Sequence, residues 1–401
     1  MMMIPRLSRR QALMGLGASF ALGPARLAFA TAAAPVAEAR LVVVLLRGAL
    51  DGLAAVPPYG DADYARHRGE LAIAEPGQEG GALDLGGKFG LHPRLTQLHT
   101  MFAANEALVL HAIAGPWRSR SHFEAQDLLE AGAGHRMASG WLNRALAAMP
   151  AEATGASRRG LALGVDVPLL LRGAAAVGSF APPGASRPEA SLLGQLALLH
   201  DQDAMLGPAF TEGLRARGFS AAVLAGTASP PGNRNAFPAL AGAAGKLLAE
   251  PNGPRIAALE LTGWDTHAFQ PQRLAGPLGA LDEGLAALKL ELGAAWARTA
   301  VLVVTEFGRT VRVNGTRGTD HGTAGCAFLA GGAVAGGRVL ADWPGLAEAK
   351  LFQNRDLAPT RDLRSVAKGL LRDHLGLSAS ALAQAFPGSF EAPAESGLLR
   401  G

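Results

Sequence analysis

The chain has 401 residues, of which 49% are hydrophobic and 17% charged, and its formal net charge is +4. All of this excess charge lies in the first 30 residues, where Arg6, Arg9, Arg10 and Arg26 occur without any acidic residue. The neutral remainder argues against a polyanion-binding surface, and the sequence has no basic stripe with interleaved aromatic residues for single-stranded nucleic acid. Because Cys326 is the only cysteine, an intramolecular disulfide is impossible, and we interpret Cys326 as a buried, inert thiol.

The first 30 residues are typical of a twin-arginine export signal. Ser8-Arg9-Arg10 precedes an apolar run from Ala12 to Ala25, and Ala28-Phe29-Ala30 offers a cleavage site of small residues. The run is interrupted by glycines and is shorter than the roughly 20 apolar residues that span a bilayer. We therefore expect export by the twin-arginine translocase, cleavage of the signal, no stable membrane insertion, and a periplasmic or secreted protein.

Four apolar runs each end at a polar or glycine-rich turn, which is the pattern of strands buried on both faces of a parallel sheet. In chain order these runs are Leu41–Leu46, Ala107–Ile113, Arg255–Leu261 and Thr299–Val304, followed by a shorter fifth run at Cys326–Leu329. The spacing of apolar residues predicts helices at Ser121–Ala131, Leu274–Ala297 and Asp362–Leu375. The alternation predicts an α/β fold with a mostly parallel central sheet and helices on both faces.

We expect a single α/β domain over residues 31–401. The stretch from about residue 137 to 253 is rich in Ala, Gly and Pro and contains the turn-forming run Ala228-Ser229-Pro230-Pro231-Gly232-Asn233. We interpret this stretch as a helical, cap-like insertion.

Polar residues follow the predicted strands, at the edge of the sheet where ligands bind in doubly wound folds. Along the chain they are Asp51 after the first strand, Arg118, Arg120, Ser121 and His122 after the second, Asp265 and His267 after the third, and Glu306 and Arg309 after the fourth, with Asp320 and His321 further on. Each group alone has a structural explanation as a turn or a helix cap. Together they place carboxylates and imidazoles at one edge.

Three of these carboxylates and two of the imidazoles form a set of oxygen and nitrogen ligands suited to Zn²⁺ or Mn²⁺. The predicted metal ligands are Asp51, Asp265, His267, Asp320 and His321. Several like charges in one place need a cation to be stable together. We expect one or two divalent ions.

Ser121 begins a predicted helix directly after a strand. A helix N-terminus favours anions through its unpaired N–H groups and its dipole, and Arg118 and Arg120 stand beside it. Two interpretations stay open. The spacing of Ser121 and Glu124 is that of a capping box, whereas a hydroxyl beside a metal and two arginines can also attack phosphorus or sulfur.

Longer motifs carry a resemblance to a known family. Together with the twin-arginine leader they are LVVVLLRGALDGL, SRSHFEAQD, GWDTH, TEFGRT and GTDHGTAG followed by GGRVLADWPGL. From Leu41 to about Pro387 the chain resembles the bacterial domain-of-unknown-function 1501 family, whose name implies no reaction. The site more remotely resembles the alkaline phosphatase and sulfatase superfamily, in which an Asp follows the first strand, a hydroxyl or thiol nucleophile opens a helix, and Asp and His pairs come later.

Asp51 matches the first of these features and Ser121 the second, and the pairs Asp265 with His267 and Asp320 with His321 match the rest. The Asp-x-His spacing is narrower than in most phosphatases. The final lone histidine of that pattern has no match, because we interpret His374, in a helical pattern, as a surface residue.

The remote resemblance implies an exported, metal-dependent hydrolase of small anionic phosphate or sulfate esters. In that protein Ser121 is the nucleophile, Arg118 and Arg120 hold the anion, and the ligands are supported by Glu306, Arg309 and His122. The alternative is an exported binding or assembly protein that keeps the fold and the metal without turnover, in which Ser121 is only a helix cap. An α/β-hydrolase esterase is disfavoured, since no Gly-x-Ser-x-Gly follows any apolar run.

Overall fold

The computed structural model describes residues 39–149, 160–164, 166–180, 195–196 and 236–401. All of these residues belong to one compact unit of the chain, 36–401. The expected export signal over residues 1–30 lies outside the described residues. Within the described ranges, no helix has both the length and the apolar character that crossing a bilayer requires.

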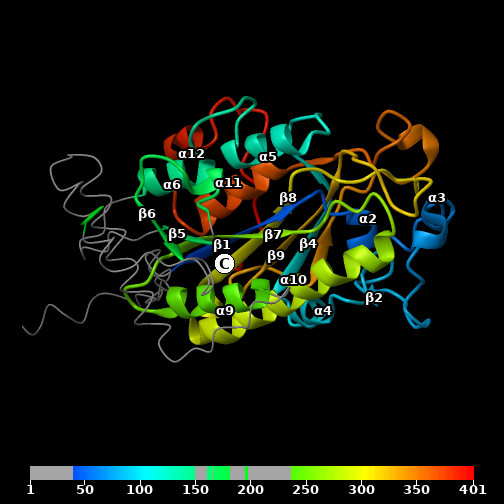
Figure 1. Ribbon diagram of the computed structural model, residues 1–401, viewed down its shortest axis with the longest axis horizontal. Coiled ribbons are helices and arrows are strands. Elements are labelled where there is room, and N and C mark those ends of the chain that lie inside the picture. The colour runs from blue at the N-terminus through cyan, green and yellow to red at the C-terminus, as the bar shows by residue number, and fades with distance from the viewer. Residues whose placement is uncertain (1–38, 150–159, 165, 181–194, 197–235) are drawn as a thin grey trace, which may run out of the picture. The chain divides into compact units, whose positions relative to one another are not determined.

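A nine-stranded sheet lies at the centre of this unit (Figure 1). Its order is β10-β4-β9-β8-β1-β7-β5-β6. Strand β11 also pairs with β4, further along that strand than β10 does. The strands are β1 (Arg40–Arg47), β4 (Ala107–Ala114), β5 (Gly160–Leu163), β6 (Val177–Phe180), β7 (Ile256–Thr262), β8 (Thr299–Thr305), β9 (Gly325–Ala330), β10 (Arg338–Leu340) and β11 (Arg361–Asp362). A separate hairpin is formed by β2 (Leu83–Asp84) and β3 (Gly90–Leu91).

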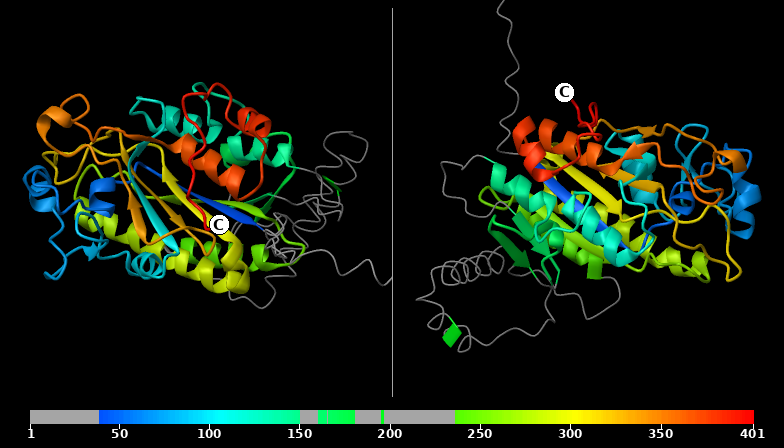
Figure 2. Two further views of the ribbon diagram at one scale, coloured as in Figure 1. Left: turned by 180° about the vertical axis from the view of Figure 1, so that it is seen from behind. Right: turned by 90° about the horizontal axis from the view of Figure 1, so that it is seen from above.

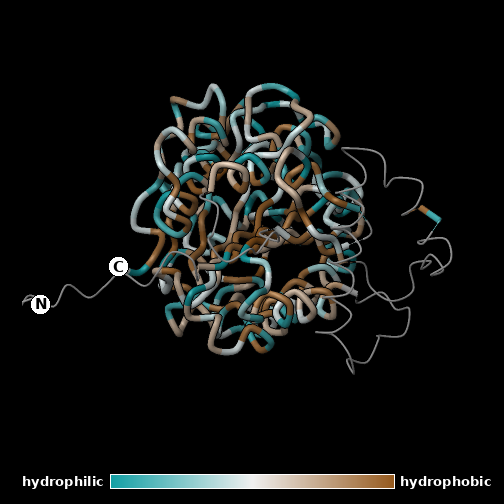
Figure 3. Tube along the Cα trace, turned by 90° about the vertical axis from the view of Figure 1, so that its left-hand side faces the viewer, coloured by the Kyte–Doolittle hydropathy of each residue, from teal (hydrophilic) through white to brown (hydrophobic). Residues whose placement is uncertain are grey.

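The five predicted strands are confirmed, each within one or two residues at its ends. The apolar run of β1 is continuous because both of its faces are covered: Leu41, Val43 and Leu45 belong to one core, and the alternate residues, including Val42 and Val44, belong to the other. Figure 3 shows the hydrophobic segments gathered towards the inside of the unit.

The expected mostly parallel sheet is correct only in part. Strand β9 pairs antiparallel with both β4 and β8, whereas the other pairings in this sheet are parallel. The loop 306–324 between β8 and β9 contains no helix that would carry the chain back along the sheet. The chain therefore re-enters the sheet from the edge at which β8 ends, and it must run in the opposite direction.

Helices cover both faces of the sheet, as predicted (Figures 1 and 2). One face is packed by α4 (Thr96–Ala103), α9 (Ala236–Ala249), α10 (Gln270–Leu292) and the 3₁₀ helix η5 (Gly293–Arg298). The other is packed by α5 (His122–Ala131), α6 (Trp141–Ala148), α11 (Leu363–Asp373) and α12 (Ala379–Ala385). Shorter helices are α2 (Gly52–Ala55), α3 (Tyr64–Arg68), η3 (Gly69–Leu71), η4 (Leu169–Leu171) and η6 (Glu348–Lys350).

The described part of residues 137–253 forms helices and strands of the central sheet and its two helical layers. It supplies α6 and α9 to the two faces, and it supplies β5 and β6, which extend one edge of the sheet from β7. The remaining residues of the stretch lie outside the described ranges. A cap-like insertion stays a prediction for those residues.

Two single-residue expectations have different outcomes. Cys326 is buried in β9, and burial raises the pKa of its thiol, which agrees with an inert core residue. His374, expected on the surface, is only 8% exposed. Its Nε2 donates to the carbonyl of Arg40 at 2.9 Å, and burial lowers its pKa, so this histidine joins the end of α11 to the start of β1.

Candidate metal centre

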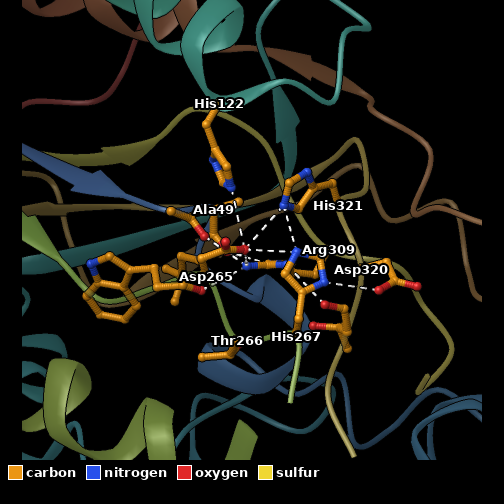
Figure 4. Close-up of polar contacts among 12 residues, drawn as sticks. Ala49, His122, Asp265, Thr266, His267, Arg309, Asp320 and His321 are labelled. Carbon is orange, nitrogen blue, oxygen red and sulfur yellow. Dashed lines mark hydrogen bonds and ion pairs between the residues drawn. The ribbon is translucent and has the colours of Figure 1, made fainter. Parts of the chain in front are cut away.

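Side chains from three segments meet at the carboxyl ends of β4, β7 and β8 (Figure 4). Asp265 and His267 follow β7, His321 comes from the loop between β8 and β9, and His122 is the first residue of α5. This is the edge at which the sequence places the site.

One carboxylate oxygen lies at the centre of the cluster. The Oδ1 atom of Asp265 is 3.4 Å from Nε2 of His122, 3.1 Å from Nε2 of His267 and 3.2 Å from Nε2 of His321. The Nε2 atoms of His267 and His321 are 2.9 Å apart. One ligand atom from each of His122, Asp265 and His321 lies within 4.8 Å of the other two, so these residues could hold a metal ion. His267 lies beside this group and contacts Asp265 and His321.

The second ring nitrogen of each histidine is fixed by an acceptor. The contacts are Nδ1 of His122 with Oε1 of Glu306 at 2.7 Å, Nδ1 of His267 with Oδ1 of Asp320 at 3.1 Å, and Nδ1 of His321 with the carbonyl of Arg120 at 2.7 Å. Carboxylates and carbonyls only accept, so every Nδ1 carries a proton and every Nε2 of a neutral ring has a lone pair. Histidines that bind metals almost always have such a partner on the other nitrogen.

These donors fit a divalent ion. Ligand atoms at 2.0–2.1 Å from a tetrahedral Zn²⁺ lie about 3.3–3.4 Å from one another, and Oδ1 of Asp265 lies 3.4 and 3.2 Å from the Nε2 atoms of His122 and His321. The Nε2 atom of His122 is buried and has no hydrogen-bond partner among the described residues, which also fits a ligand. Imidazole and carboxylate donors are ligands of several divalent transition metals, Zn²⁺ among them.

Arg309 is a buried residue that links Asp265 to the surrounding loops. Its side chain is fully buried and forms an ion pair with Oδ1 of Asp265. It also donates to the carbonyls of Gly48, Ala49, Trp264 and Thr319 at 2.9–3.1 Å, and so joins the loops that follow β1 and β7 to the loop before β9. Burial alone would raise the pKa of Asp265, but the hydrogen bond and charge of Arg309 lower it to about 2.

Glu306 holds His122 in a similar way. It is 1% exposed, and its Oε1 accepts from Gln126 at 2.9 Å and from the backbone of Gly48 at 2.9 Å as well as from His122. Burial raises its pKa, but these hydrogen bonds, led by that of His122, lower it to about 2. Glu306 raises the pKa of His122 in turn, whereas burial lowers that of His321.

Two of the predicted ligands, Asp51 and Asp320, make no contact with Oδ1 of Asp265 among the described residues. Asp51 is 1% exposed, caps α2 through Leu53 and Ala54, accepts from Gln270 at 2.6 Å and forms a buried ion pair with Arg68. Arg68 thus supplies the positive charge that the sequence argument assigned to a metal.

Asp320 lies on the outer side of His267, away from Oδ1 of Asp265. Its Oδ1 accepts from His267 and from Asn314, both at 3.1 Å. His122, expected only as a support, is one of the three residues that could hold an ion. Its position directly after Ser121, at the start of the helix that follows a strand, was the available signal.

The residues expected to bind the substrate lie beside the cluster. Ser121 is exposed at the N-cap of α5 and its hydroxyl caps nothing, so the capping box with Glu124 is not formed. Arg118 donates to two nearby carbonyls at 2.7 and 2.8 Å. Arg120 forms an ion pair with Asp356 at 2.7 Å, and its side chain is 30% exposed.

The sequence model of a protein family described as "Protein of unknown function (DUF1501)" matches residues 105–385. The chain therefore belongs to this family, as the motifs imply. A search among curated proteins finds no match.

Solved structures show distant similarities. Ps i-CgsB in complex with a neocarrahexaose is 11% identical, with a TM-score of 0.40 over 85% of this chain and 72% of that one. Alkaline phosphatase from the Antarctic bacterium TAB5 is 12% identical, with a TM-score of 0.37 over 75% and 94% of the two chains. The periplasmic domain of EcEptC from Escherichia coli, in complex with Zn, is 9% identical, with a TM-score of 0.29 over 73% and 72%. The chemistry of the site has to be inferred from this chain's own residues.

Proposed function

We propose that the protein is an exported, metal-dependent hydrolase of phosphate or sulfate esters. The observation that carries the proposal is the convergence of three imidazole Nε2 atoms on Oδ1 of Asp265, with each opposite Nδ1 already bonded. His122, Asp265, His267 and His321 would hold the ion. A divalent cation bound there, best Zn²⁺, polarises an ester oxygen and lowers the pKa of a neighbouring hydroxyl.

The cluster is open to a substrate on one side. The side chains of Asp265 and His267 are 46% and 43% exposed, whereas Arg309 beneath them is fully buried. Arg309 keeps Asp265 ionised and in place, and Glu306 keeps Nε2 of His122 directed at the same oxygen. The ligands are therefore held before any substrate arrives, which lowers the reorganisation that catalysis requires.

Ser121 is the proposed nucleophile. It immediately precedes the ligand His122, and its hydroxyl makes no hydrogen bond with another described residue. The N–H groups of the first turn of α5 favour an anion at this position. The Ser121 oxygen would bond to phosphorus or sulfur as its proton passes to the departing ester oxygen, and water would then hydrolyse the covalent ester and restore the hydroxyl.

Arg118 and Arg120 would attract the anionic ester. Each lies within three residues of Ser121 and bonds protein groups through only part of its guanidinium. Their charges flank the entrance rather than the metal itself, so we expect them to act on KM more than on kcat.

A second candidate is the exported binding protein without turnover. It would be favoured if His267 joined His122, Asp265 and His321 as a fourth protein donor, because structural zinc sites are closed by four protein ligands. The exposure of Asp265 and His267 favours the hydrolase instead, because a further ligand can approach from solvent.

The test combines elemental analysis with turnover. We expect the purified chain to bind zinc and to hydrolyse an aryl phosphate or an aryl sulfate slowly, with inhibition by phosphate or vanadate. Ser121→Ala should lower kcat by several orders of magnitude and keep its metal, since the nucleophile acts in the transition state. Ser378→Ala is the matched control, because Ser378 is also a helix N-cap. A zinc-loaded wild type that turns over neither ester class, and whose Ser121→Ala form behaves identically, supports the binding protein.

A further inference from the structure

His321 depends on a main-chain carbonyl for its orientation. Its Nδ1 donates to the carbonyl of Arg120 at 2.7 Å, which leaves the lone pair on Nε2, facing Oδ1 of Asp265 at 3.2 Å (Figure 4). Arg120 lies in the stretch 115–121 between β4 and α5, which is neither helix nor strand. A contact that fixes the position of the Arg120 carbonyl therefore also fixes the orientation of the His321 ring.

The side chain of Arg120 is anchored to a buried carboxylate. Its Nε and Nη2 donate to Oδ2 of Asp356 at 3.1 and 2.7 Å, and the Thr323 hydroxyl donates to the same oxygen at 2.8 Å. Asp356 is 0% exposed, whereas the Arg120 side chain reaches solvent. A buried carboxylate costs free energy unless it is paired, and Asp356 is paired through Oδ2 with Arg120 and through Oδ1 with Arg355 at 3.1 Å.

A strained turn presents Asp356. Phe352 and Asp356 exchange backbone hydrogen bonds of 2.8 and 3.0 Å, and between them Gln353 and Asn354 both have φ near +53°. Two consecutive left-handed residues other than glycine are unfavourable and persist only where their surroundings determine them. The Gln353 side chain accepts from Nη2 of Arg120 at 2.7 Å, so the strained turn and the anchor form one structure.

We propose that Asp356 is a positioning residue of the metal centre: it anchors Arg120 and thereby sets the direction and the protonated nitrogen of His321. This inference rests on the metal centre of the proposed function, and it assigns the guanidinium of Arg120 a role in holding a ligand as well as in attracting the substrate. Asp356 acts on the ligand His321 through one residue, Arg120.

The test is the binding of Zn²⁺ alone to the full chain, together with the absorption spectrum of its Co²⁺ form. Asp356→Ala should weaken Zn²⁺ binding by about 10- to 100-fold, the usual effect of losing a group that orients a ligand. It should also shift the Co²⁺ bands, since the direction of His321 changes. Asp356→Asn keeps an acceptor for Arg120 without the charge, and we expect it to restore part of the affinity.

Two controls separate positioning from general destabilisation. Asp282→Asn alters another buried carboxylate, which caps α4 through the backbone of Gln97 and Leu98 at 2.9 and 2.8 Å. Thr323→Val removes a different hydrogen bond to Asp356 and leaves Arg120 in place. Both should lower the thermal midpoint without changing Zn²⁺ affinity or the Co²⁺ spectrum.

An Asp356→Ala chain that binds Zn²⁺ within twofold of the wild type, with an unchanged Co²⁺ spectrum, overturns the proposal. If that variant does not fold, Arg120→Met removes the same anchor from its exposed side, and the same two readouts apply. Wild-type protein that binds no Zn²⁺ contradicts the proposed function itself, and the inference falls with it. The two failures are distinguishable because the wild type is titrated first.

Discussion

Two arginine–carboxylate pairs lie at the same edge of the sheet and have opposite surroundings. Asp51 and Arg68 are 1% and 0% exposed, and the remaining contacts of Asp51 are backbone N–H groups and an amide. Arg309 is equally buried, but its partner Asp265 is 46% exposed and faces three imidazole nitrogens. In both pairs the arginine neutralises the carboxylate charge. Only around Asp265 do side chains keep lone pairs that could bind a cation.

The imidazoles thus decide which pair becomes a ligand site. The lone pairs of the Asp51 carboxylate are taken up by N–H donors, so it cannot bind a cation. Oδ1 of Asp265 instead faces Nε2 atoms whose lone pairs repel it unless a cation lies between them. We therefore expect one ion per chain, which narrows the one or two ions that the sequence allows.

The largest expected effect is a loss of stability on breaking the buried ion pair of Asp51 with Arg68. Asp51→Ala leaves Arg68 buried without a counter-charge, which should lower the free energy of unfolding by about 3–5 kcal/mol. Asp265→Ala should cost clearly less, because water reaches Asp265 and four carbonyls still hold Arg309. Urea unfolding of both variants without metal checks this. Equal losses would show that the two pairs are equivalent.

The next prediction concerns how the stability of the protein depends on pH through His111, a buried histidine that interacts electrostatically with Asp51. His111 is fully buried beside the carbonyl of Val56, and burial lowers its pKa to about 4. Between about pH 6.5 and 4 the unfolded chain binds a proton at His111 that the folded chain does not, so stability is complete above this window and falls as the pH drops through it.

The loss assigned to His111 should reach about 3 kcal/mol near pH 4. Urea unfolding at pH 7 and pH 4.5 measures it, with His111→Gln as the reference that lacks the titrating ring. Wild type and variant losing stability in parallel would remove His111 as the cause.

The smallest effect compares two helix N-termini. Ser378 caps α12 by accepting from the backbone N–H of Ala381 at 3.2 Å, whereas Ser121 at α5 caps nothing. Ser378→Ala should cost about 1 kcal/mol of stability, and Ser121→Ala only a few tenths. Thermal and urea unfolding of the two variants test this difference. A comparable loss in Ser121→Ala would mean that its hydroxyl is structural.

Much of the fold follows from the sequence, because buried strands leave continuous apolar runs and helices leave periodic ones. The direction of β9 does not, since burial on both faces is the same for parallel and antiparallel strands. The convergence of Asp265, His267 and His321 follows from their places after strands that share an edge.

The remainder of the site depends on contacts that no local pattern records. Arg68 lies in a short helix 17 residues from Asp51 in the chain, and nothing in its surroundings marks it as a partner. The role of His122 depends on which of its nitrogens Glu306 binds, 184 residues away. Asp356, more distant still, is identifiable only from its contact with Arg120.

The most direct test of the central claim is the number of zinc ions bound per chain, measured by elemental analysis after saturation and removal of excess metal. We expect one ion in the wild type and one in Asp51→Asn, but none in the double variant His122→Ala, His321→Ala. Two ions in the wild type, loss of the ion in Asp51→Asn, or an ion retained by the double variant would contradict a single centre built from His122, Asp265, His267 and His321.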